Sequence, residues 1–424
     1  MRLLACLPTC LLTCCLIAPA AFAEEETRWY KGVTHIHSIW SDGDMAPEMI
    51  ADWYKERDYH FVCFSEHNRM QSGEYAFSIE EDGFLTEERV DMIRERFGDD
   101  WVVIQERAGR RQMVLKTHDE LGDYFNEDEK FLMIPAEEIT TAFGSPHVNA
   151  VNLRDNIPGT QGNVVPLLNQ YLDAVHEQSK EYGVPMIAHV NHLNWSDGVS
   201  TEQMLQARRL KHFEIYNGHP GVRQWGDIDR GMPSNDRHWD VILSLRMRDE
   251  PDFILYGLAT DDSHRYFEWG LGRVNPGRGW VMVRATALDE DIITGAMDRG
   301  DFYSSTGVTL HDVVIDDEGY RVIIDAEEGV SYTTEFIGTR VGFDDSSEAP
   351  EVEPDGGTPR PSRRYHTTIG QVLHTTTDTN AYYPFDGDEI YVRARVTSDK
   401  LQDNPVHEGD FEMVWTQPVR VATP

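Results

Sequence analysis

The sequence predicts an α/β barrel followed by a β-sandwich domain. Between residues 24 and 309, short apolar segments typical of strands alternate with segments typical of helices, and this alternation is the pattern of a parallel α/β barrel. Ionisable residues follow several of the predicted strands, as they do in barrels that carry their chemistry at the C-terminal ends of the strands. From about residue 310 to residue 424 the helices stop and short alternating strands take over, which indicates a β-sandwich.

The barrel elements are predicted from apolar spacing and from the residues at their ends. In the segment 46–57 apolar residues recur at helical spacing, and Gly183 and Gly300 are natural stops for two later helices. The predicted helices are 46–57, 87–97, 165–182, 201–209, 236–247 and 288–299. The predicted strands include one that ends near residue 37, then 61–65, 101–105, 131–135, 185–189, 212–217, 254–259 and 280–284. In the second domain, strands are expected at 313–315, 320–324, 334–337, 389–396 and 412–416.

The first residues have the pattern of a secretory signal peptide. Arg2 precedes an apolar run over 3–18, and Ala21-Phe22-Ala23 is the small-x-small pattern that signal peptidase cleaves. We therefore expect residues 1–23 to be removed and the mature protein to be periplasmic or secreted. No later segment is long and apolar enough to predict a membrane-spanning helix.

Composition and charge narrow the classes of partner. Hydrophobic residues make up 40% of the chain, which is sufficient for a packed core. The formal net charge is -36, and such a surface repels phosphate backbones and anionic lipid. We therefore expect no docking on nucleic acid or membrane, while the oligomeric state stays open. Cys63 is the one cysteine outside the predicted signal peptide, so no intrachain disulfide is expected in the mature chain.

The pair His35-Ile36-His37 is the starting point for a metal site. Residues two apart point to the same side of an extended backbone, so both imidazoles can bind one cation. The pair alone is a weak signal, but Asp42 follows in a Ser-Asp-Gly turn, and further His and carboxylate residues follow later predicted strands. Mixed imidazole and carboxylate ligands favour two or three divalent ions of zinc, manganese or iron.

In order, these motifs resemble those of the PHP (polymerase and histidinol phosphatase) family of metal-dependent phosphoesterases, over roughly residues 29–310. The matching segments are 35–37 with 41–43, 65–68, 134–140, His147, 188–189 and 262–264. The resemblance implies a distorted (β/α)7 barrel with two or three metal ions. It implies three ligand sets: His35, His37, Glu138 and Asp262; Glu138, His147 and His189; and Asp42, His67 and His264.

The chain departs from the family pattern at several positions. Glu66 stands where Asp is usual before His67, and Ala136 replaces a common Gly. No Pro follows His189, where Val190-Asn191-His192 stands instead. Either of two adjacent residues, Glu137 or Glu138, can be the bridging carboxylate, and we prefer Glu138 because it keeps the spacing to Ile139-Thr140.

Paired metals predict a hydrolase that uses water as its nucleophile. Two close metal ions lower the pKa of a water molecule and neutralise charge on a phosphoryl oxygen, so the expected substrate is a small phosphate mono- or diester. The nucleophile and phosphate-loop motifs Gly-x-Ser-x-Gly and Gly-x-x-x-x-Gly-Lys are absent from the sequence. His192 is a candidate general acid. Arg265 is a candidate phosphate clamp, with Arg111 and Lys116 as further candidates in a basic segment.

Two alternatives remain open. An amidohydrolase acting on a C–N or C–O bond also begins with His-x-His on a barrel, but usually has a carbamylated Lys as the metal bridge where this chain offers Glu138. A non-catalytic binding protein is the other alternative, in which the β domain recognises a glycan or a partner and the metals serve only stability. Turnover of amides or lactones without phosphatase activity would favour the first.

Overall fold

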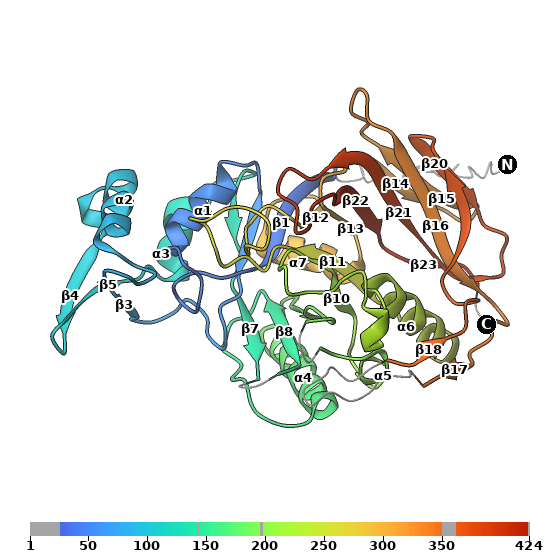
Figure 1. Cartoon of the computed structure of the whole chain (residues 1–424), viewed down its shortest axis with the longest axis horizontal. Coiled ribbons are helices and arrows are strands. Elements are labelled where there is room, and N and C mark those ends of the chain that lie inside the picture. The colour runs from blue at the N-terminus through green and yellow to red at the C-terminus, as the bar shows by residue number, and fades with distance from the viewer. Residues whose placement is uncertain (1–25, 142–143, 196–197, 350–361, 423–424) are drawn as a thin grey trace, which may run out of the picture.

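The computed structural model describes residues 26–141, 144–195, 198–349 and 362–422. The predicted signal peptide, residues 1–23, lies outside the described residues. Over the described ranges the chain is a mixed α/β protein with seven α-helices and two large sheets (Figure 1). Among the helices of these ranges, none has the length and apolar character needed to cross a lipid bilayer.

Six of the seven helices in the described ranges lie where the sequence predicts them, whereas the helix His118–Phe125 was not predicted. Gly183 and Gly300 adopt left-handed conformations, with φ of 70° and 83°, and end α4 and α7. The helix predicted over 201–209 is a single turn, started by a capping box between Ser200 and Gln203. The helices are α1 Pro47–Lys55, α2 Glu87–Phe97, α3 His118–Phe125, α4 Val164–Tyr182, α5 Thr201–Met204, α6 Asn235–Asp249 and α7 Glu290–Arg299.

The first large sheet runs through both halves of the chain. Its order is β19-β16-β21-β22-β13-β12-β1-β2-β6, and β23 pairs with β21. The strands are β1 Arg28–Ile36, β2 Phe61–Phe64, β6 Leu132–Met133, β12 Trp280–Ala285, β13 Phe302–Ser305, β16 Tyr332–Arg340, β19 Gln371–Thr376, β21 Glu389–Leu401, β22 Phe411–Thr416 and β23 Val419–Arg420. Because β13 pairs with β22, with Tyr303 opposite Thr416, the sheet crosses the predicted domain boundary at 309/310.

The second sheet has the order β11-β10-β9-β8-β7. Its strands are β7 Ala136–Thr140, β8 His147–Val151, β9 Ile187–Val190, β10 His212–Asn217 and β11 Tyr256–Thr260. β9, β10 and β11 are parallel, whereas β8 is antiparallel to both β7 and β9. In the described ranges no continuous β-ladder joins the two sheets, and the β-bridges between their edges are isolated ones, Ile36 with Ser263 and His67 with Glu138. The structure therefore does not confirm a closed (β/α)7 barrel.

An apolar layer between the two sheets separates the opposite ends of the strands. Phe61 and Ile187 start β2 and β9, and they pack in one cluster with Leu258 and with Ile293 and Met297 of α7. The other ends of these strands carry the polar residues described below. The apolar cluster therefore lies at the starts of β2 and β9, away from the polar residues at their other ends.

The C-terminal strands form two layers. A three-stranded sheet of β14 Leu310–Ile315, β15 Gly319–Ile324 and β20 Asn380–Pro384 packs on the C-terminal part of the first sheet. Tyr320 and Val322 of the small sheet share one apolar cluster with Phe336, Val392 and Val414 of the large one. This packing accounts for the alternating pattern of the sequence after residue 310.

A buried ion pair joins these strands to the first half of the chain. Arg393 of β21 is fully buried, and its Nε and Nη2 atoms each lie 2.9 Å from a carboxylate oxygen of Asp240 on α6. Nη2 also lies 2.8 Å from Asp236 Oδ1, one turn earlier on the same helix. The two carboxylates thus neutralise a guanidinium that water does not reach.

An arm projects from the body of the protein (Figure 1). It contains α2, the 3-10 turn Asp99–Trp101 and a small sheet of β3 Ala76–Ser78, β4 Val103–Arg107 and β5 Arg110–Val114. Its own apolar cluster includes Leu85, Ile93 and Met113 and extends to Trp40 of the body. The remaining elements are the 3-10 turn Ile228–Arg230 and the pair β17 Ser347–Glu348 and β18 Arg364–Tyr365.

The buried His238 of α6 predicts acid sensitivity in the metal-free protein. Its ring nitrogens lie 2.9 Å from Thr201 Oγ1 and 3.3 Å from Asn194 Oδ1, and burial lowers its pKa to about 3. The unfolded chain therefore binds one more proton than the folded chain between about pH 6 and pH 4, so this group destabilises the fold as the pH falls. In His238→Gln, urea unfolding is expected to show a slope of unfolding free energy against pH smaller by about 1.4 kcal/mol per unit. Equal slopes in the chelator-treated wild type and variant would contradict this.

Candidate metal centre

The ends of several strands bring histidines and carboxylates together in one cluster. His35 lies near the end of β1, and His37 is the first residue after this strand. Asp262 lies two residues after β11, and His147 begins β8. Because β8 is antiparallel to its neighbours, the start of this strand lies at the same edge as the ends of the others. The described members of the cluster are His35, His37, Asp42, His67, Glu138, His147, His192, Asp262 and His264.

Glu138 lies at the centre of the cluster, and its two oxygens face different imidazoles. The distances from Oε2 are 2.9 Å to His67 Nδ1 and 3.5 Å to both His35 Nε2 and His37 Nε2, and those from Oε1 are 3.1 Å to His147 Nδ1 and 3.4 Å to His192 Nε2. Oε2 is buried and has no hydrogen-bond partner within the described ranges. A buried carboxylate oxygen that faces imidazole nitrogens without a hydrogen bond fits a metal cation.

Three groups of side chains offer ligand atoms within 4.8 Å of one another. They are His37, Asp42, His67 and His264; His35, His37 and Glu138; and Glu138, His147 and His192. Asp262 adjoins the second group, because its Oδ1 lies 3.2 Å from His35 Nε2 and 3.5 Å from His37 Nε2. Glu138 belongs to two of the groups, so one carboxylate is positioned to bridge two ions.

The electrostatics of the cluster favour bound positive charge. Burial alone would raise the pKa of Glu138, but the neighbouring imidazoles of His67, His35 and His147 hold that pKa well below its ordinary value. Burial opposes protonation of His67, yet Glu138 and Asp42 raise the pKa of this imidazole to about 11. A cation at this place is therefore strongly attracted, and a metal ion would replace the proton.

The surroundings of His37 shift its pKa in the opposite direction from that of His67. Burial, together with the neighbouring His264 and His67, lowers the pKa of His37 to about 3. The imidazole is therefore neutral at pH 7, which is the form that binds metal. Gly43 packs directly against the backbone of His37, since a Cβ atom added at this glycine would lie 2.4 Å from the backbone oxygen of His37.

All the predicted ligands except His189 lie in these groups or beside them. His189 Nδ1 lies 3.6 Å from Glu214 Oε1, and both ring nitrogens are buried without a hydrogen-bond partner in the part of the chain that the structure describes. His192, predicted as a general acid, occupies the place expected for His189 beside Glu138 and His147. Its positive φ of 26° turns the chain back toward the cluster just after β9.

The predicted phosphate clamps lie in other surroundings. Arg265 donates to the backbone oxygens of Asp42 and His264 at 3.2 and 3.0 Å, so it supports the loop that carries a candidate ligand. Arg111 pairs with Glu87 on the arm, and Lys116 pairs with Glu120 at 3.3 Å. These contacts give the three cations structural partners.

Supporting residues around the ligands were not predicted from the sequence. Glu214 of β10 is fully buried and lies 2.6 Å from His35 Nδ1. When this nitrogen carries the proton, His35 Nε2 is left as a free lone pair that faces Glu138, the arrangement typical of metal-bound histidine. Glu214 also accepts the backbone N–H of His192 at 2.7 Å and the amide of Asn217 at 2.8 Å. The signal that could have identified Glu214 was a carboxylate between apolar residues inside the predicted strand 212–217.

Two neighbouring glutamates face away from the cluster and stabilise the fold around it. Glu66, which precedes His67, accepts the Ser41 hydroxyl at 2.5 Å and the Gln71 amide at 2.9 Å, so it holds the loop after β1. Glu137 accepts the backbone N–H of Ile157 at 2.8 Å. Of the two possible bridging residues, the structure thus brings Glu138 to the ligand groups and Glu137 to the opposite side of β7.

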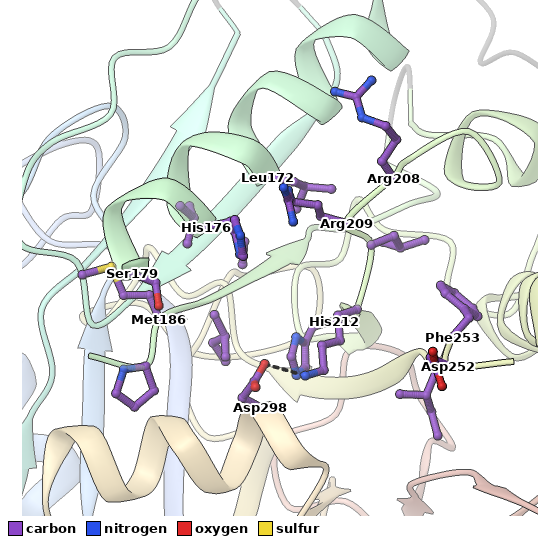
Figure 2. A pocket seen from close by; sticks show the side chains of 17 residues that line it. Leu172, His176, Ser179, Met186, Arg208, Arg209, His212, Asp252, Phe253 and Asp298 are labelled. Carbon is purple, nitrogen blue, oxygen red and sulfur yellow. Dashed lines mark hydrogen bonds and ion pairs between the residues drawn. The ribbon is translucent and has the colours of Figure 1, made fainter. Parts of the chain in front are cut away.

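A large cavity of about 460 Å³ lies at the other end of the strands. Figure 2 shows its lining, with His176 on α4, His212 at the start of β10, and Arg208 and Arg209 in the segment before β10. Its cations already have partners: Arg208 and Arg209 each donate to Asp173 at 2.7 Å, and Lys211 donates to Asp298 at 2.8 Å. This cavity is separate from the metal-ligand cluster.

Comparisons with known proteins add little to this geometry. No protein-family model matches the chain, and no curated protein matches it. A solved two-domain protein from Bacteroides vulgatus ATCC 8482, described as containing a predicted PHP-like metal-dependent phosphoesterase, is similar at 15% identity and a TM-score of 0.40, over 93% of this chain and 96% of that one. A similarity this remote establishes neither fold nor activity, so the functional argument rests on the side chains.

Proposed function

We propose that the protein is an exported metal-dependent phosphoesterase that hydrolyses a phosphate mono- or diester. The observation that carries this proposal is the Glu138 carboxylate, whose two oxygens face two different sets of imidazoles. Export is supported by the pattern of residues 1–23.

The donor set fits two or three ions of zinc, manganese or iron. Imidazole and carboxylate ligands together favour these metals. Glu138 would be shared between two ions, with His35, His37 and Asp262 on one side and His147 and His192 on the other; Asp42, His67 and His264 would hold a third. When bound, such metals lower the pKa of water and neutralise charge on a phosphoryl oxygen.

The residues of this chain orient the ligands and supply the surrounding charge. Glu214 fixes the His35 tautomer through the 2.6 Å contact at Nδ1, and Arg265 holds the Asp42 loop through its backbone. An anionic substrate would be repelled by the carboxylates of the cluster unless cations occupied it. The position between the imidazole groups holds Glu138 rather than the lysine that the amidohydrolase alternative usually needs, which favours phosphoester hydrolysis.

The test combines metal analysis with hydrolysis. The purified mature protein is loaded with Zn, Mn or Fe and assayed against an aryl phosphomonoester, an aryl phosphodiester, an amide and a lactone. We expect phosphoester turnover that a chelator removes and metal restores, and a loss of at least about 100-fold in His37→Ala and in Asp262→Ala. Unchanged turnover in both variants would refute this site, and turnover of the amide or lactone alone would refute the reaction.

A further inference from the structure

Trp195, which follows β9, and residues 219–222, which follow β10, form one wall beside the metal-ligand cluster. Trp195 forms an isolated antiparallel bridge with Val222. Gly221 lies against both His219 and Trp195: a Cβ atom added at this glycine would lie 3.0 Å from His219 Cε1 and 3.2 Å from Trp195 Cδ1. The rings of Trp195 and His219 therefore lie against the same short stretch of backbone.

The two rings of this wall contact different ligand groups. The Trp195 ring centroid lies 5.6 Å from that of His147 and 5.2 Å from that of His192. The His219 ring lies edge to face with His264, with 6.1 Å between centroids. Because His147 and His192 belong to one ligand group and His264 to another, the wall spans the side of the cluster that joins the two groups.

The chemistry of the wall is that of a platform for a flat, uncharged group. Trp195 and His219 are both half-buried, and both rings contact imidazoles of the cluster. An indole offers a broad apolar face with a preference for other aromatic rings. His219 Nδ1 accepts the backbone N–H of Gly221 at 2.9 Å, so the neutral ring carries its proton on Nε2 and offers one hydrogen-bond donor.

We infer that this wall binds the leaving group of the substrate, and that the leaving group carries an aromatic ring. The inference rests on the proposed function, because a phosphoryl group held at the cluster must direct its ester-linked group to one side. Trp195 would stack on the ring, and His219 would donate a hydrogen bond to an oxygen of the ester. The substrate class is therefore a phosphate ester of an aromatic alcohol.

Benzyl phosphate and cyclohexylmethyl phosphate provide the test. Both are esters of primary alcohols of similar size, but only the first carries a flat ring. The metal-loaded wild type is expected to hydrolyse benzyl phosphate with a kcat/KM about 3- to 10-fold higher, the range of a single aromatic stacking contact. Trp195→Phe is expected to keep this preference, and Trp195→Leu, which keeps apolar bulk without a flat ring, is expected to lose it.

Three further measurements make the outcome unambiguous. Metal content is measured for every variant, so that a lost ligand group is distinguished from a lost platform. Trp269→Leu is the matched control, since this exposed tryptophan stacks on Trp53, and it is expected to keep the wild-type preference. His219→Ala is expected to lower kcat/KM for both esters alike by about 2- to 10-fold, as for one hydrogen bond.

Equal turnover of the two esters by the wild type would overturn the inference and leave the proposed function standing. A Trp195→Leu variant that lowers kcat/KM for both esters by the same factor would also overturn the inference and leave the proposed function standing. Absence of any phosphoester turnover by the metal-loaded wild type would overturn both.

Discussion

Glu138→Gln is expected to lower kcat/KM for phosphoester hydrolysis by at least about 1,000-fold and to reduce bound metal. The substitution keeps the shape of the side chain but removes the charge that two ligand groups share. Even the loss of a residue that only supports a metal ligand typically costs 10- to 100-fold, so the loss of a shared ligand is expected to cost more. Metal content by mass spectrometry and steady-state kinetics on an aryl phosphate measure the two effects.

Glu137→Gln is the matched control for this experiment. Glu137 precedes Glu138 on the same strand, but its oxygens accept hydrogen bonds from Asn156 and Ile157. Burial raises the pKa of Glu137 to about 7, so a neutral amide resembles a form that this side chain readily adopts. We expect activity and metal content close to wild type. Equal losses in the two variants would show that the charge of Glu138 has no special role.

Arg393→Met is expected to destabilise the protein by about 3–5 kcal/mol. Removing the guanidinium leaves Asp240 as a buried carboxylate without its cation and leaves Asp236 with Arg395 alone, at 3.2 Å. Breaking a buried ion pair from one side has a cost of this size. The loss is measured as the difference in the free energy of unfolding in urea between the metal-loaded wild type and the metal-loaded variant. Because the pair joins α6 to β21, unfolding of the two halves is also expected to become less cooperative.

Two controls separate the buried charge from the change in packing. Arg395→Met removes a guanidinium that is 25% exposed and pairs with Glu335 at 2.7 Å and with Asp236 at 3.2 Å. Because water reaches this guanidinium and Asp236 keeps Arg393, the substitution is expected to cost about 1 kcal/mol. Adding Asp236→Asn and Asp240→Asn to Arg393→Met removes the uncompensated carboxylates and is expected to restore part of the lost stability. No recovery in the triple variant would contradict the electrostatic explanation.

Local sequence signals predicted the elements that local chemistry determines. The stops at Gly183 and Gly300 depend on a glycine in a left-handed conformation, and both helices end there. The histidines at positions 35 and 37 face the same cluster because side chains alternate along an extended strand. Such features involve a few neighbouring residues, so their pattern is present in the sequence itself.

Features that depend on distant partners were beyond this kind of inference. The antiparallel direction of β8 depends on its pairing with β7 and β9, and the uniform alternation in the sequence suggested parallel strands. The positive φ of His192 brings this residue, rather than His189, to Glu138 and His147. Glu214 was missed because its partner, His35, lies far away in the sequence and only the fold brings the two together.

The continuous first sheet has a consequence for the order in which the chain folds. β1, β12 and β13 pair in that order and are all synthesised before β22. The free edge of β13 pairs with β22 near the C-terminus, where Tyr303 lies opposite Thr416. Until the ribosome has released the last strands, that edge presents unpaired backbone groups, a template for association with other chains. Contacts between residues so distant also slow folding, so this protein is expected to need protection from aggregation during its synthesis.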